Sequence, residues 1–180
     1  SRGLGDVYKR QDIPLPESIN DNFLNKPWYQ TRKWWPSIDT EYFDEKEWKK
    51  TIRAYYGSIT MMDYFIGQIL EKAKECSGGR PTRVIFTSDH GEMLGSHGLM
   101  QKVVYYEESF RIPFIICWPE RIRPGIEPLH LGSPDIMPTL LGLAGLEKAI
   151  PQNIDGKDYS SILLGKNNKR PDFALYIKPG

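Results

Sequence analysis

The chain has 180 residues, of which 39% are hydrophobic and 26% are charged, and its formal net charge is +1. This apolar fraction is enough for one domain with a buried core, and the small net charge favours neither a nucleic acid nor a membrane surface as a partner. The longest apolar runs fall far short of the roughly 18 residues that a membrane-spanning helix requires.

The first 43 residues carry no clear periodicity. Residues 1–11 resemble translated sequencing-library adapter, so we expect a non-native segment there and exclude it from the fold. Residues 12–43 are rich in proline, asparagine and aromatic side chains and predict a long surface loop. Aromatic residues in it, such as Trp28 and Tyr29, would either form a wall on which a sugar stacks or pin the loop to the body of the protein.

Residues 45–75 predict the longest helix, because their apolar side chains recur at helical spacing. Asp44 precedes this run and is expected to cap the first turn. Gly78 and Gly79 follow the run and are expected to end the helix, since glycine adopts the left-handed C-terminal conformation at little cost. The apolar positions are Trp48, Ile52, Tyr55, Tyr56, Ile59, Met62, Ile66, Ile69, Leu70 and Ala73.

Two short apolar runs, residues 83–88 and 112–118, predict strands buried on both faces of a parallel sheet. Cys117 lies in the second run and is expected to be a buried structural thiol. A helix capped by Ser133 or Asp135 should then extend to about Leu143. Helix, strand, loop, strand and helix in this order are typical of an α/β fold.

The segment with the most chemical content directly follows the first predicted strand. Asp89 and His90 stand where that strand ends, the position at which α/β sheets bind ligands. The Asp89 carboxylate suits a hard divalent cation. Further along the same loop, Lys102 provides a compact positive charge for a sulfate or phosphate oxygen. The glycine-rich turns between them would allow His97 to face the same anion.

These residues resemble the second metal-binding motif of the sulfatase family, within the alkaline phosphatase superfamily. The resemblance extends over about residues 45–165 and covers the later part of such an enzyme. Its motifs are Ser88–Gly91, Leu94–Gly98, Lys102, Tyr106–Ile115 and Asp135–Leu141.

The resemblance implies part of an alkaline-phosphatase-like sandwich, with a mostly parallel central sheet and flanking helices. Residues 12–165 would be the C-terminal part of the catalytic domain, and residues 166–180 the start of a further subdomain. Asp89 and His90 would bind Ca²⁺, with Mg²⁺ or Mn²⁺ as other possibilities, and Lys102 would contact the transferred group. His97 would either protonate the leaving alcohol or serve as a structural histidine.

Sulfatases of this kind use a formylglycine nucleophile, made from the first residue of a Cys/Ser-x-Pro/Ala-x-Arg motif. Cys76 and Arg80 have the matching spacing, but the central proline or alanine is missing. Cys76 also falls at a predicted helix C-terminus, whereas an anionic nucleophile favours a helix N-terminus. We therefore expect the nucleophile in a preceding half outside this chain, and no turnover by the chain alone.

The implied activity of the whole protein is hydrolysis of a sulfate ester, with a sulfated glycan or small molecule as substrate. Phosphonate monoester or phosphodiester hydrolases of the same superfamily share these motifs and are the first alternative. A non-catalytic binding module derived from the superfamily is the second. Similar enzymes are exported, so a periplasmic or secreted protein is expected, with its oligomeric state left open. Nucleic acid and membrane partners are not expected.

Overall fold

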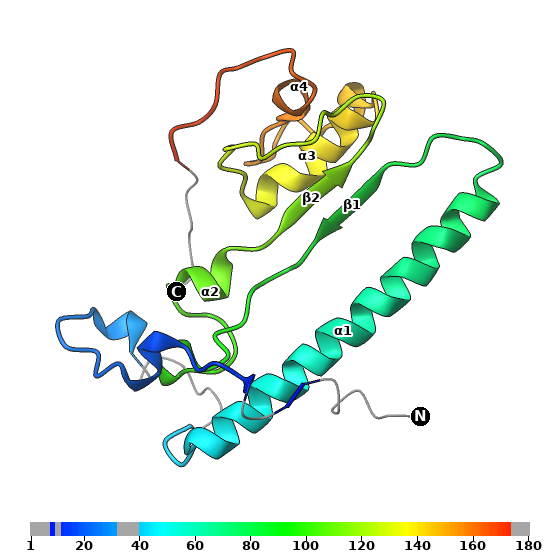
Figure 1. Ribbon diagram of the computed structural model, residues 1–180. Helices are drawn as coiled ribbons and strands as arrows, with labels where there is room; N and C mark the ends of the chain where they lie inside the picture. Colours follow the sequence, from blue (N-terminus) through cyan, green and yellow to red (C-terminus); the bar gives the residue numbers. More distant parts are fainter. Residues whose placement is uncertain (1–7, 10–11, 32–39, 174–180) are drawn as a thin grey trace. The chain divides into compact units, whose positions relative to one another are not determined.

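The computed structural model describes residues 8–9, 12–31 and 40–173, which form the α/β order that the sequence predicts (Figure 1). Among the described residues, the main elements are accompanied by short 3₁₀ helices at Glu17–Asn20, Trp28–Gln30, Ser96–Gly98 and Glu147–Ala149. The main elements are α1 (Glu45–Cys76), β1 (Val84–Thr87), α2 (Glu107–Phe110), β2 (Phe114–Cys117), α3 (Ser133–Leu143) and α4 (Ser160–Leu163).

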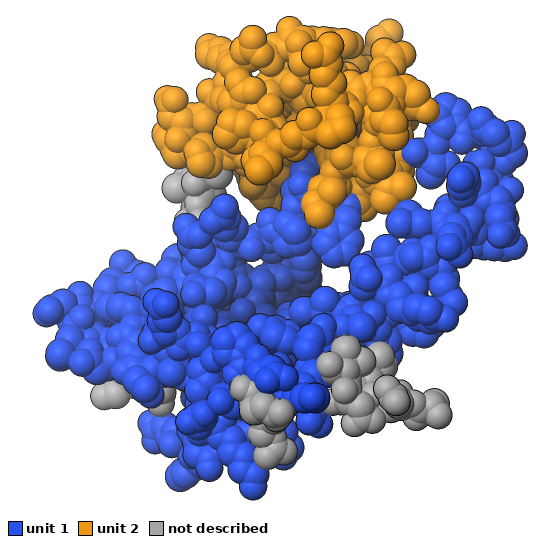
Figure 2. Space-filling model, in the orientation of Figure 1, with its two compact units in different colours: residues 1–82, 86–114 blue, residues 83–85, 115–180 orange. Residues whose placement is uncertain are grey.

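The chain divides into two compact units (Figure 2). The first comprises residues 1–82 and 86–114, and the second comprises residues 83–85 and 115–180. All four predicted site residues fall in the first unit. The predicted boundaries at residues 11 and 165 stay predictions, and much of the 1–11 segment lies outside the described residues. Tyr8 is described, and its hydroxyl lies 2.8 Å from Thr60 Oγ1 on α1.

Helix α1 has the ends that the sequence predicts. Asp44 accepts a hydrogen bond from the backbone N–H of Glu47 at 2.8 Å, and Gly78 and Gly79 follow the helix with φ of 60° and 81°. Its apolar stripe is buried only at the N-terminal end, where Trp48 packs against Phe43. Along the rest of the stripe the large apolar side chains are exposed; they include Tyr55, Ile59, Met62, Ile69 and Leu70. Among the described helices, none is long and apolar enough to cross a membrane.

Strands β1 and β2 pair as neighbours and run in opposite directions (Figure 1). Each is shorter than its predicted run, and β2 starts just after Pro113, which cannot donate a ladder hydrogen bond. The prediction that these two strands are parallel and buried on both faces is wrong for this pair, since the strands are antiparallel and Phe86 and Ile115 are 44% and 58% exposed. Cys117 is likewise exposed. An apolar run indicates that a strand suits burial, but it does not identify what covers the strand.

In the second unit, α3 begins at Ser133 after the N-cap residue Gly132, so Ser133 is not the predicted cap, whereas Asp135 stabilises the start of the helix. One Asp135 carboxylate oxygen accepts a hydrogen bond from Gly132 N, and the other accepts one from Lys157 N, both at 2.8 Å. Thr139 is fully buried and accepts a hydrogen bond from Tyr159 N at 3.1 Å. The motif around α3 therefore anchors the turn that leads to α4 and builds this unit's core.

Candidate active site

Asp89 and His90 leave the end of β1 side by side. The backbone N–H of His90 donates to Asp89 Oδ1 at 3.0 Å, and Ser88 Oγ donates to the His90 carbonyl at 2.9 Å. These short-range hydrogen bonds fix the backbone after β1. The two side chains lie side by side, with Asp89 Oδ2 3.5 Å from His90 Nε2. The Asp89 side chain is 83% exposed, so its second oxygen remains open to a ligand.

The ring of His90 is held in the tautomer that a metal ligand requires. Its Nδ1 lies 2.7 Å from the carbonyl oxygen of Gly91. A carbonyl oxygen only accepts, so Nδ1 carries the proton and the neutral ring has its lone pair on Nε2. Backbone carbonyls commonly orient metal-binding histidines in this way. The Nε2 atom of His90 and the open oxygen of Asp89 are thus close enough for one cation to contact both.

Lys102 lies close enough to influence this carboxylate. Partial desolvation acts to raise the pKa of Asp89, but hydrogen bonds from the backbone N–H groups of Asp89 and His90, together with electrostatic interactions with His90 and Lys102, hold this pKa below the ordinary value. The carboxylate is therefore ionised at neutral pH, as cation binding demands. Among the described residues, no group of three or more histidine, cysteine, aspartate and glutamate side chains is arranged around one point. In the part of the chain that the structure describes, Asp89 and His90 therefore stand as a pair without a third such side chain.

Lys102 stands on a compact loop, residues 91–109, that closes on itself. Gly91 N donates to the Ser109 carbonyl at 2.9 Å and joins the two ends of the loop. A second backbone bond, from Met93 N to the Gln101 carbonyl at 2.8 Å, ties its two arms together. The loop is packed by its own buried side chains, Met93, Leu99, Val104 and Tyr106, with Phe23 against them. Such self-packed loops with adjacent ends are frequently functional.

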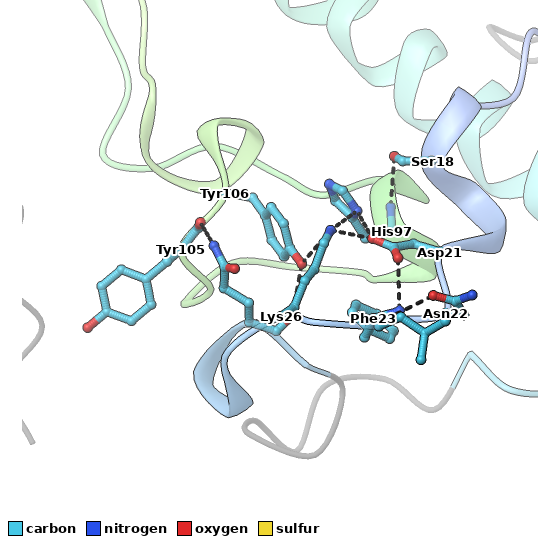
Figure 3. Close-up of polar contacts among 10 residues, drawn as sticks. Ser18, Asp21, Asn22, Phe23, Lys26, His97, Tyr105 and Tyr106 are labelled. Atoms are coloured by element: carbon cyan, nitrogen blue, oxygen red, sulfur yellow. Dashed lines mark hydrogen bonds and ion pairs between the residues drawn. The ribbon is translucent and has the colours of Figure 1, made fainter.

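His97, at the tip of this loop, contacts the 12–31 segment and not the strand end. Its Nδ1–H donates to Asp21 Oδ2 at 2.6 Å, and its backbone N–H donates to Ser18 Oγ at 3.1 Å (Figure 3). The imidazole stacks on the Tyr106 ring with centroids 3.9 Å apart, and the side chain is mostly buried. Lys26 pairs with the same Asp21 oxygen and donates to the Tyr106 hydroxyl at 3.2 Å.

Hydrogen bonding from Lys26 is the largest cause of a strongly lowered pKa at Asp21; burial opposes it, and bonds from Phe23 N and His97 reinforce it. For Lys26, burial acts to lower the pKa, but hydrogen bonds to Asp21 and Tyr106 outweigh it and raise the pKa. Asp21 and Lys26 are partners that the sequence did not reveal. They lie about seventy residues before His97, in a loop without periodicity, so no local signal identifies them.

Beyond Lys102, helix α2 brings a second set of charged residues to the surface. Arg111 donates to Glu107 at 2.9 Å, one helical turn away, and an open hollow is lined by Tyr106, Glu107, Glu108 and Arg111. In the 12–31 segment, Tyr29 packs edge-to-face on Tyr105 at 5.2 Å between centroids. This contact favours the pinning role for the aromatic residues that the structure describes.

Comparison with known proteins agrees with the geometry. The model of the sulfatase family matches residues 20–146. An endo-4-O-sulfatase of Bacteroides thetaiotaomicron is 40% identical over 72% of this chain and 26% of its own length. An ulvan-active sulfatase of Formosa agariphila is 33% identical over 91% of the chain and 29% of its own length. A solved phosphonate monoester hydrolase of Silicibacter pomeroyi superposes with a TM-score of 0.73 at 25% identity, over 96% of the chain and 35% of its own.

The chain thus spans between a quarter and about a third of the length of these relatives. Over that span the matches include every motif from the strand end to α3. The family match covers more than half of the chain, and its relatives and structural neighbours are of one superfamily. The chain belongs to the sulfatase family.

Proposed function

We propose that the whole protein to which this chain belongs hydrolyses a sulfate ester, and that the substrate is a sulfated carbohydrate. The observation that carries the proposal is the proximity of Asp89 Oδ2 and His90 Nε2, which lie 3.5 Å apart just after the end of β1. One relative is named as active on ulvan and another as an endo-4-O-sulfatase. Both names support the sulfate ester, and the first supports a glycan.

Asp89 and His90 are the residues of this chain that would hold a divalent cation. Together they offer a carboxylate oxygen and an imidazole nitrogen. Ca²⁺ prefers oxygen ligands, so this pair is less selective for Ca²⁺ than a set of oxygens alone would be, and Mg²⁺ or Mn²⁺ also fit. When bound, such an ion supplies positive charge that polarises the ester's sulfate group. The remaining ligands and the formylglycine nucleophile would come from residues outside this chain.

Lys102 would contact an oxygen of the transferred group. Its influence on the Asp89 carboxylate supports this role, because both charges then act on the same small region. An ammonium group placed where negative charge develops stabilises the transition state more than the bound substrate.

A proton-donating role for His97 stays a prediction. Its Nδ1 is committed to Asp21, and its ring stacks on Tyr106 in a largely buried position. These contacts favour the structural alternative, in which His97 ties the loop to the 12–31 segment. We therefore assign the chemistry of this chain to Asp89, His90 and Lys102.

Hydrolysis of phosphonate monoesters is the second candidate function. It is favoured by the match to the hydrolase of Silicibacter pomeroyi, which extends over nearly the whole chain. Sulfate and phosphonate esters both present tetrahedral anions, so the same cation and lysine serve either reaction. A binding module without catalysis is the third candidate. Export to the periplasm or medium is the localisation we propose, and cell fractionation tests it.

The deciding experiment compares the full-length protein on 4-nitrophenyl sulfate and on 4-nitrophenyl phenylphosphonate, with and without added Ca²⁺. We expect a higher kcat/KM on the sulfate, abolished by a chelator and restored by metal. A strong preference for the phosphonate would establish the second function. Metal binding without turnover of either ester would identify a binding module.

A further inference from the structure

Lys102 is flanked on both sides by residues in left-handed backbone. Gln101 has a φ of 68° and Val103 a φ of 75°. Neither is glycine, and a positive φ is a true outlier for a β-branched residue such as Val103. Residues of this kind persist only where the surroundings over-determine them, and they gather at functional sites. The strain here brackets the one residue of the loop proposed to contact the transferred group.

Two side chains hold the strained backbone in place. On one side, Glu92 Oε1 accepts a hydrogen bond from Gln101 N at 2.5 Å and a second from Leu94 N at 3.2 Å. On the other side, Ser109 Oγ accepts a hydrogen bond from Val103 N at 3.0 Å. Both neighbours of Lys102 therefore donate their backbone N–H to a side chain and not to regular secondary structure.

Ser109 is itself firmly anchored. It is 4% exposed, its N–H donates to the Tyr106 carbonyl at 2.9 Å, and its carbonyl accepts from Gly91 at the closed end of the loop. Glu92 follows Asp89, His90 and Gly91 directly. We call these two hydrogen-bonding side chains, Glu92 and Ser109, the clamps of the loop. Each clamp connects the backbone beside Lys102 to the segment that carries the two proposed metal donors.

We propose that Glu92 and Ser109 are positioning residues that fix the direction in which Lys102 projects toward the anion. This inference rests on the proposed function of Lys102. Glu92 acts through the hydrogen bonds that its Oε1 accepts from the loop backbone. Removing either clamp lets Gln101 or Val103 relax to an ordinary φ and turns Lys102 away.

The test uses steady-state kinetics of the full-length protein on 4-nitrophenyl sulfate. We expect Glu92→Ala to lower kcat about 10- to 100-fold with little change in KM, the scale of a small misplacement of a catalytic group. Glu92→Gln keeps the accepting oxygen and should retain most of the rate. Glu71→Ala, an exposed glutamate on α1, is the matched control and should match the wild type.

A double-mutant cycle separates positioning from general damage. In a Lys102→Ala background, Glu92→Ala should change kcat by less than about twofold, since the residue it positions is gone. An equal loss of kcat in both backgrounds would overturn the proposal, as would a Glu92→Ala enzyme with the wild-type kcat. Ser109→Ala, alone and combined with Lys102→Ala, provides a second cycle of the same kind for the Val103 side of the loop.

Hydrogen exchange keeps the two proposals distinguishable. In both alanine variants the amides of Gln101 and Val103 should exchange faster than in the wild type, while those of α3 stay unchanged. If the wild type hydrolyses neither ester, the proposed function fails, and the exchange still reports whether the clamps exist. Unchanged exchange at both amides would refute the clamps irrespective of activity.

Discussion

Gly91 lies so close to the backbone of Glu108 that a Cβ atom on it would be 2.0 Å from the Glu108 carbonyl oxygen. The two residues close the 91–109 loop, and Gly91 also follows directly on His90. Glycine is needed here for space and not for an unusual φ. The loop that carries Lys102 therefore starts at the residue directly after His90.

Gly91→Ala should therefore destabilise the protein. The added methyl group forces the loop ends apart, and over-packing of this kind costs about 1–3 kcal/mol. Thermal unfolding should show a lower Tm, and activity on the sulfate ester should fall with it. Gly125→Ala is the matched control, since nothing lies within 4 Å of a Cβ there. Equal Tm values for the two variants would contradict the close approach.

Asp89→Ala should abolish metal-dependent activity. Removing a residue that only hydrogen-bonds to a metal ligand typically lowers metal affinity or activity about 10- to 100-fold. Loss of a direct donor should therefore lower kcat by at least about 100-fold. Metal content by mass spectrometry should fall in parallel. Asp63→Ala, an exposed carboxylate on α1, serves as control. Near-normal turnover with normal metal content would refute the ligand role.

Lys102→Ala should lower kcat more than it raises KM, because the ammonium group acts on charge formed in the transition state. Loss of one such group costs about 100- to 1,000-fold. Lys50→Ala, an exposed lysine on α1, should leave both constants unchanged. A raised KM at constant kcat would instead indicate that Lys102 binds substrate and transition state equally.

Asp21 should make the protein sensitive to acid. Its pKa is lowered chiefly by the hydrogen bond from Lys26, with smaller contributions from Phe23 N and His97, and burial opposes this lowering. The ionised carboxylate is thus favoured by folding. Its contribution is fully present above the ordinary aspartate pKa of about 3.9 and is lost as pH falls through the lowered value.

Asp21→Asn should accordingly cost about 1.5–3 kcal/mol of unfolding free energy at pH 7, the range for hydrogen bonds to charged groups. The gap to the wild type should narrow below pH 4. Urea titrations at several pH values measure it. A gap that stays constant down to pH 2 would show that Asp21 does not titrate with folding.

His97→Asn distinguishes the two roles left open for this histidine. His97 has a φ of 56°, which asparagine tolerates well. If the ring is structural, Tm should fall while kcat stays within about threefold, because general acid catalysis would be worth 100-fold or more. A loss of that size at unchanged Tm would restore the proton-donating role.

Local sequence signals predicted the elements that depend on local chemistry. The Asp44 cap, the Gly78–Gly79 end of α1 and the position of Asp89 and His90 after a strand all follow from a few adjacent residues. The Asp21–His97 pair could not be predicted in this way, because 76 positions separate the two residues and neither lies on a periodic element. The strain around Lys102 also escaped notice, since Gln101 and Val103 are not residues that indicate a positive φ.

Burial was the least predictable property. Composition identifies side chains that are apolar enough for a core, but it does not show whether other parts of the chain cover them. Phe86, Ile115 and Cys117 are apolar and nevertheless exposed. The same difference appears along α1, where one stripe is buried at Trp48 and Ile52 and exposed from Tyr55 onward.

That stripe determines how this polypeptide behaves in water. Contiguous apolar surface promotes self-association, and β1 and β2 add strand edges that pair readily with other chains. We therefore expect the exposed stripe of α1 and the edges of the strand pair to govern the solubility of the isolated chain. We expect polar substitutions at Met62 and Ile69 to reduce self-association without altering Asp89, His90 or Lys102.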